Sequence, residues 1–188
     1  MLGKVADSPP LPLLLTPILF WLISQCIMLT KCQSLKCRYG GGIDIPDTWW
    51  FGFGADNSDD TLYNYLDRLG PQGRRAYTEI NLLDFIIYIP SYTLLLWALL
   101  FRQCRYAGIS TSILPWICCM VVVVCDVIES LLFGYATRQF PNRLDSYLLL
   151  ITSIANQGKW ISLLLGLLTL VALSVRNNFV GGGKSHQC

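Results

Sequence analysis

Long, continuous runs of apolar residues dominate the pattern of this chain, and short polar stretches separate them. Four runs stand out, at about 13–30, 82–101, 113–133 and 147–174. A helix that crosses roughly 30 Å of hydrocarbon needs about 20 mainly apolar residues, and each run is close to that length. Because the apolar residues come in long runs and not in amphipathic stripes, lipid is the expected solvent. The pattern predicts an all-α membrane protein with four transmembrane helices.

The connections between these runs predict the arrangement of the helices. Residues 102–112 and 134–146 form short links, so the last three spans should run antiparallel in an up-down bundle. Residues 31–80 form a much longer connection, and we expect them to make an extramembrane cap. An even number of spans places both termini on one side, and the positive-inside rule favours the cytoplasm for them. Residues 1–188 are expected to form a single membrane domain.

Within the cap, residues 49–53 form an aromatic cluster of the kind found at headgroup depth. Leu62, Leu66 and Leu69 then follow at helical spacing, which predicts a short amphipathic helix. Gly70-Pro71 should end that helix, and Pro71 suits the first turn of the next one, which leads into the second span. The sequence therefore predicts an ordered cap that lies on the membrane face.

The composition agrees with a membrane protein. Of 188 residues, 53% are hydrophobic and 14% are charged, whereas soluble domains carry about 25% charged residues. The net charge is only +2, and no basic patch alternates with aromatic residues. We therefore expect the lipid bilayer as a partner and no nucleic acid.

The cysteines and the histidine give no recognisable site. Cys32 and Cys37 follow the first apolar run and have two open interpretations, a disulfide or two free thiols. His186 is the single histidine, and no group of residues has the spacing of a zinc site. No metal is expected, and no motif identifies a cofactor.

Polar and ionisable residues occur inside the last three predicted spans. They are Asn81, Asp84, Tyr88, Ser91 and Tyr92 around span two, Asp126 and Glu129 in span three, and Asn156 and Lys159 in span four. Within each span their spacing places them on one helical face. An ionisable group in hydrocarbon costs at least about 2.5 kcal/mol and normally faces the bundle interior. In an up-down bundle the half nearest the cap contains Asp84, Asp126, Glu129, Asn156 and Lys159, together with Gln25 of span one. The pattern predicts one intramembrane site.

The charges of this predicted site do not balance, because three carboxyl groups accompany one lysine. Either a proton or a further cation should compensate them. Arg74 or Arg75 of the cap is one source of that cation, and a ligand amine, a choline-like headgroup or a metal ion is another. Pro90 cannot donate a hydrogen bond to the carbonyl of Ile86, which predicts a kink near Asp84.

Three small residues in span four, Gly158, Ser162 and Gly166, recur every four positions and permit close helix approach. If the chain is a subunit of a larger complex, this face should be available to a partner. A self-contained protein should bury it.

Three sequence features together carry a family resemblance. They are an Asp at the start of span two, Asp126-Val127-Ile128-Glu129 in span three and Lys159-Trp160 in span four. The chain resembles a set of small, uncharacterised four-span membrane proteins with D, D-x-x-E-N and K-W signatures. The segment 65–74 before span two is also similar to theirs. Ser130 stands where that pattern has Asn. The resemblance covers most of residues 60–160 and implies no known activity.

Our leading hypothesis is a site that binds or modifies a lipid-like or small amphiphilic molecule. If it is an enzyme, Asp126 and Glu129 are the expected acid/base pair and Lys159 stabilises negative charge. Asp84, Tyr88, Asn156, Asn81 and Tyr92 are the expected ligand-binding residues. The alternatives are a purely structural polar network, a proton or ion pathway, and a non-enzymatic subunit or assembly factor that docks on a membrane-protein partner.

Overall fold

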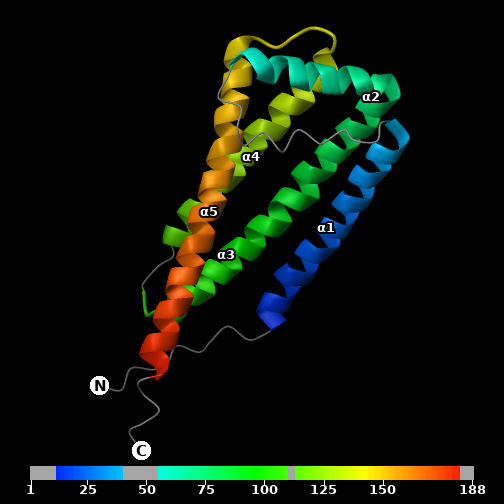
Figure 1. Ribbon diagram of the computed structural model, residues 1–188. Helices are drawn as coiled ribbons and strands as arrows, with labels where there is room; N and C mark the ends of the chain where they lie inside the picture. Colours follow the sequence, from blue (N-terminus) through cyan, green and yellow to red (C-terminus); the bar gives the residue numbers. More distant parts are fainter. Residues whose placement is uncertain (1–11, 40–54, 110–112, 183–188) are drawn as a thin grey trace, which may run out of the picture.

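The computed structural model describes residues 12–39, 55–109 and 113–182, and all regular elements in these ranges are helices (Figure 1). In chain order they are α1 (Pro12–Tyr39), α2 (Ala55–Leu83), the π-helix η2 (Asp84–Tyr88), α3 (Ile89–Tyr106), α4 (Ile113–Gln139) and α5 (Ser146–Gly182). Four helical stretches are long and apolar enough to span a membrane: Leu14–Tyr39, Leu62–Tyr106, Pro115–Gln139 and Ser146–Asn177. The all-α class with four membrane-spanning helices is therefore confirmed.

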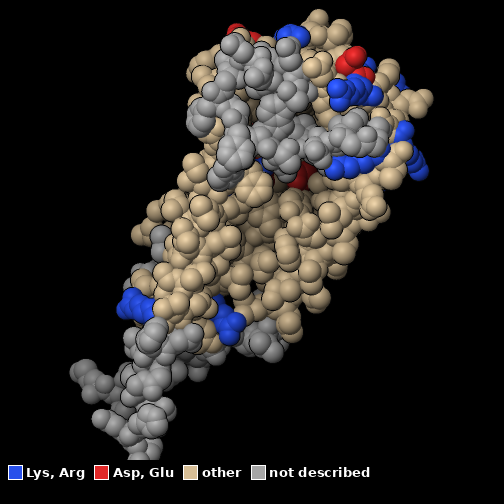
Figure 2. Space-filling model, in the orientation of Figure 1, with Lys and Arg blue, Asp and Glu red and all other residues tan. Residues whose placement is uncertain are grey.

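The surface of the helices is apolar along much of their length. Leu29 of α1 is 65% exposed, Leu131 of α4 is 60% exposed and Val171 of α5 is 60% exposed. On the face shown in Figure 2, charged side chains gather toward the two ends of the molecule, and an uncharged band separates them. Large contiguous apolar surfaces of this kind are uncommon on soluble monomers. The chain is a multi-pass membrane protein.

Helix α2 changes direction at Gly70, where φ is 62° and ψ is 177°. These angles lie in a region that is essentially accessible only to glycine. The first part of α2 lies across one end of the bundle, and the second part turns into the direction of α3 (Figure 1). The helix break is at the expected residue, whereas the cap as a whole stays a prediction. The aromatic cluster 49–53 lies outside the described residues.

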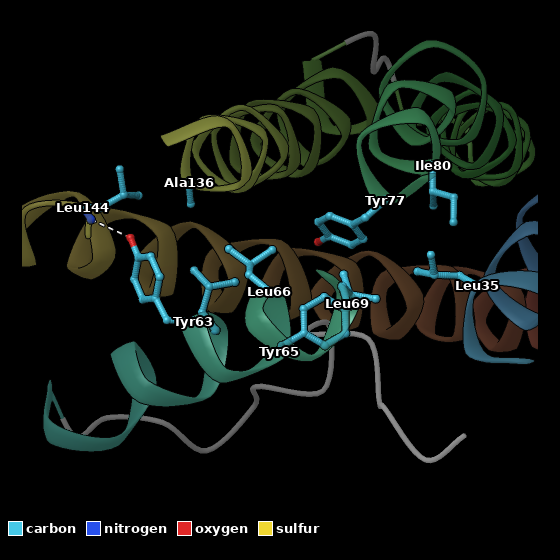
Figure 3. Packing of buried hydrophobic residues seen from close by; sticks show 10 residues of the cluster. Leu35, Tyr63, Tyr65, Leu66, Leu69, Tyr77, Ile80, Ala136 and Leu144 are labelled. Atoms are coloured by element: carbon cyan, nitrogen blue, oxygen red, sulfur yellow. Dashed lines mark hydrogen bonds between the residues drawn. The ribbon is translucent and has the colours of Figure 1, made fainter. Parts of the chain in front are cut away.

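A cluster of buried apolar residues holds the first part of α2 against the bundle. Figure 3 shows Leu66 of α2 near Ala136 of α4, and Tyr63 of α2 near Leu144, which lies in the link between α4 and α5. The hydroxyl of Tyr63 accepts a hydrogen bond of 2.5 Å from the backbone N–H of Leu144. These contacts fix α2 to the ends of α4 and α5.

Arg74 belongs to this packing and not to the predicted charged site. Its guanidinium donates a hydrogen bond of 2.9 Å to the carbonyl of Leu66 and lies 4.2 Å from the ring centre of Phe140. The expectation that Arg74 balances the intramembrane carboxylates therefore receives no support from its contacts.

Helix α1 continues past the apolar run and ends only at Tyr39. Cys32 and Cys37 consequently lie in the helix and not in a loop after it, and no disulfide joins them. Of the two open interpretations, the structure has the two thiols.

Gly158 and Gly166 of α5 face neighbouring helices. A Cβ atom on Gly158 would lie 2.9 Å from Sγ of Cys125 in α4, and one on Gly166 would lie 3.4 Å from Cδ1 of Leu96 in α3. Both glycines thus allow α5 to approach its neighbours within this chain. These two glycines of the small-residue face are therefore used inside the bundle.

Candidate functional site

The centre of the site is an ion cluster between α4 and α5. Nζ of Lys159 lies 3.0 Å from Oδ1 of Asp126 and 2.7 Å from Oε2 of Glu129. All three residues are buried, with exposed fractions of 6% for the lysine, 4% for the aspartate and 3% for the glutamate. Asp126 and Glu129 are three residues apart on α4, so one turn of helix presents both carboxylates to the same ammonium group.

Neutral donors occupy the other oxygen of each carboxylate. The hydroxyl of Tyr92, on α3, donates to Oδ2 of Asp126. The side-chain amide of Asn156, on α5, donates to Oε1 of Glu129 over 2.6 Å. Each carboxylate is therefore held between Lys159 and a neutral donor. These contacts supply the hydrogen bonds and the ion pairing that buried carboxylates require, with one ammonium group serving two carboxylates.

A second polar group joins α2 and η2 to α4. The hydroxyl of Ser130 donates to Oδ2 of Asp84 over 3.2 Å, and the amide of Asn81 donates to the backbone carbonyl of Ser130 over 2.8 Å. A Cβ atom on Gly134 would lie 3.0 Å from Nδ2 of Asn81, so the glycine leaves room for that amide. Ser130 stands where the D-x-x-E-N signature has Asn, and it contacts both Asp84 and Asn81.

Asp84 begins the π-helix η2, which ends immediately before Ile89 and Pro90. The backbone N–H of Ile89 donates to the carbonyl of Asp84, five residues earlier. Because a proline cannot donate to the carbonyl four residues before it, the expected disturbance near Asp84 takes the form of a wider helical turn.

Helix α1 is joined to this side of the bundle by two hydrogen bonds. The amide of Gln25 donates to the hydroxyl of Tyr88 over 2.9 Å, and the hydroxyls of Ser24 and Ser91 lie 2.6 Å apart. These contacts set the level of α1 relative to η2 and α3.

A cavity of about 600 Å³ lies next to these polar groups. It is lined by residues of α1, α2, η2, α4 and α5: Gln25, Met28, Leu29, Cys32, Gln33, Lys36, Tyr77, Ile80, Asn81, Asp84, Tyr88, Asp126, Glu129, Ser130, Phe133 and Lys159. This volume is within the range of about 300–1,000 Å³ that is typical of small-molecule sites. The cavity combines polar groups with an apolar wall.

The structure brings the predicted site residues together in two layers. Six of the eight line the cavity: Asn81, Asp84, Tyr88, Asp126, Glu129 and Lys159. Tyr92 and Asn156 are not among the lining residues, and they hold the carboxylates of Asp126 and Glu129 from behind. In this structure both side chains support the carboxylates, and their expected role as ligand contacts stays a prediction.

Gln33 and Lys36 also line the cavity. Neither was expected there, because the predicted first span ends at residue 30. A signal was present in the sequence. Gln25, Leu29, Cys32 and Lys36 recur at positions i, i+4, i+7 and i+11, which share one helical face. Since α1 continues to Tyr39, that face reaches the cavity along three turns.

Within the described ranges, no group of three or more His, Cys, Asp or Glu side chains has a geometry that could hold a metal ion. Asp126 and Glu129 instead share Lys159. The acid/base assignment of these two carboxylates stays a hypothesis.

No protein-family model, curated protein or solved structure matches this chain. The resemblance to the four-span proteins with D, D-x-x-E-N and K-W signatures therefore stays a proposal, and the site is interpreted from its own geometry.

Proposed function

We propose that this membrane protein binds a small amphiphilic or lipid-like molecule in the cavity between α1 and α4. The observation that carries the proposal is the mixed lining of that cavity. Asp84 and the Lys159 cluster are polar, whereas Met28, Leu29 and Phe133 are apolar. An amphiphile offers both kinds of surface, so it complements such a site better than a fully polar solute does.

The position of the cavity supports a ligand that comes from the bilayer. Leu29 lines it and is also 65% exposed on α1, beside the apolar surface of the molecule. A molecule dissolved in lipid therefore meets the cavity without first entering water. Asp84 and the buried Lys159 cluster make the interior of the cavity polar, which suits the headgroup of an amphiphile.

Binding is the part of the hypothesis that the geometry favours over catalysis. A general base must be able to accept a proton from a substrate. Here Lys159 bridges both candidate carboxylates, and Tyr92 and Asn156 donate to their other oxygens. Such a cluster presents a fixed pattern of charge to a ligand.

The docking-subunit alternative predicts a small-residue face that is available to a partner. Gly158 and Gly166 instead pack against Cys125 and Leu96 of the same chain. This packing supports a self-contained protein.

The proposal is tested by filling the cavity. We expect native mass spectrometry of the gently extracted protein to show a bound amphiphile, and Leu29→Trp to lose it, because the larger ring occupies the cavity. The matched control is Leu19→Trp, which changes a 56% exposed leucine of the same helix away from the lining. A ligand retained by both variants, or no ligand in the unchanged protein, contradicts the proposal.

A further inference from the structure

The charged groups that line the cavity differ in their surroundings. Three carboxyl groups and two amines contribute to the lining. Lys159 is held between Asp126 and Glu129 at 3.0 and 2.7 Å. Outside this cluster, the charged residues of the lining are Asp84 and Lys36. With every group ionised, the lining carries an excess of one negative charge.

Asp84 and Lys36 lie at different depths. Gln25 contacts Tyr88, which sets a common level for α1 and η2. Asp84 lies one helical turn from that level, toward the end of the bundle that α2 covers. Lys36 lies about three turns from the same level in the same direction. Asp84 and Lys36 are therefore about two turns apart, which corresponds to about 11 Å along the helix axes. The cavity is thus acidic in its interior and basic toward the α2 end.

The surroundings of Asp84 suit a positively charged group. Its carboxylate is partly buried and accepts a hydrogen bond from Ser130. The ring of Tyr88, one turn away, also lines the cavity. A carboxylate attracts an ammonium group through charge, and an aromatic face attracts it through its quadrupole. A cation at this place would also balance the excess negative charge.

Lys36 favours a ligand that carries an anion as well. A purely cationic headgroup would be repelled by the amine toward the α2 end, and a purely anionic one by the carboxylates in the interior. We propose, on the basis of the binding function above, that the ligand has a zwitterionic headgroup. Its ammonium group contacts Asp84 and Tyr88, and its phosphate or similar anion is directed to Lys36.

This inference is tested with amphiphiles that share one chain and differ in headgroup. The probes are dodecylphosphocholine, dodecyltrimethylammonium, dodecyl phosphate and dodecyl maltoside. Binding to the full chain is measured by native mass spectrometry from nanodiscs of a neutral glycolipid, so that the bilayer itself does not compete. We expect dodecylphosphocholine to bind at least about tenfold more tightly than the other three, since one charge-assisted contact is worth that factor. Phosphocholine without a chain should bind more weakly still, which shows that the ligand is an amphiphile and not a free solute.

Two neutralising variants locate the charges. Asp84→Asn should weaken dodecylphosphocholine binding about tenfold more than dodecyl maltoside binding, because only dodecylphosphocholine has an ammonium group that contacts the carboxylate. Lys36→Gln should weaken dodecylphosphocholine and strengthen dodecyltrimethylammonium. Asp67→Asn and Lys31→Gln are the matched controls, since both residues are exposed on α2 and α1 and neither lines the cavity. Melting temperatures near that of the unchanged protein confirm that each variant is folded.

The outcomes separate this inference from the proposed function. If Leu29→Trp abolishes binding while all four headgroups bind equally, the cavity binds amphiphiles and the zwitterion inference is wrong. The same conclusion follows if Asp84→Asn has no effect. If no amphiphile binds at all, both proposals fail.

Discussion

Lys159 of α5 lies 3.0 Å from the carboxylate of Asp126 on α4, and both side chains are buried. The same ammonium group lies 2.7 Å from Glu129. Removal of one partner from a buried ion pair leaves an uncompensated charge, which is more costly than the lost attraction alone. The cluster therefore couples the stability of the bundle to the integrity of the cavity that it lines.

Lys159→Met should destabilise the fold by about 3–5 kcal/mol, because two carboxylates lose their shared cation. Adding Asp126→Asn should recover part of this loss, since it removes one of the two uncompensated charges. Equilibrium unfolding in mixed micelles measures both free energies. If Lys159→Met alone changed the free energy of unfolding by less than about 0.5 kcal/mol, the cluster would not be what holds α4 to α5.

Tyr92→Phe should cost about 1–3 kcal/mol, because Oδ2 of Asp126 loses the hydroxyl that donates to it. The control is Tyr135→Phe on α4, whose side chain is 47% exposed. It should change the free energy of unfolding by less than about 0.5 kcal/mol. Equilibrium unfolding in mixed micelles compares Tyr92→Phe with Tyr135→Phe. Equal changes in the free energy of unfolding would argue against a supporting role for Tyr92.

Gly158→Ala should destabilise the fold by about 1–3 kcal/mol through overpacking, because its Cβ atom would lie 2.9 Å from Sγ of Cys125. The Cβ atom of Cys125 lies at 4.0 Å, which is ordinary contact. In a Cys125→Ala background the same change should therefore be neutral, or stabilising by up to about 1 kcal/mol from helix propensity. A double-mutant cycle measures the difference. Equal effects of Gly158→Ala in both backgrounds would show that α4 and α5 are not packed at this point.

Gly70→Ala should cost about 1–3 kcal/mol although no atom lies within 4 Å of the added methyl group. The reason is the backbone, since φ is 62° and ψ is 177° at this residue. Hydrogen exchange should show faster exchange of the backbone amides from residue 62 to residue 69. Asn64→Ala, an exposed change on the same helix, serves as the control. Unchanged protection in Gly70→Ala would mean that the direction of α2 does not depend on this glycine.

Much of the fold follows from the sequence because lipid imposes simple requirements. The runs around residues 82–101, 113–133 and 147–174 are long and apolar enough that α3, α4 and α5 were expected. The break at Gly70-Pro71 was also predictable, because it depends on local backbone chemistry. The extent of α1 was not, because residues 31–39 are mostly polar and their helix depends on contacts such as that of Leu35 in the α2 cluster.

The sequence predicted which residues lie together in the site better than it predicted what each of them contacts there. Helical periodicity and depth identified Asp84, Asp126, Glu129 and Lys159 as neighbours. The same periodicity could not show that Tyr92 and Asn156 donate to carboxylates from behind, because that depends on how α3, α4 and α5 are rotated against one another. The part of the predicted cap at residues 40–54 lies outside the described part of the chain.

The most direct test of the account is a structure of the protein determined by electron cryo-microscopy in nanodiscs made from its own membrane, with a bound antibody fragment that adds mass. We expect non-protein density in the cavity between α1 and α4. It should contact Asp84 and extend along Met28 and Leu29 toward the lipid. A cavity that is closed by movement of α1 onto α4, or filled by side chains of the protein, would contradict the proposed binding site.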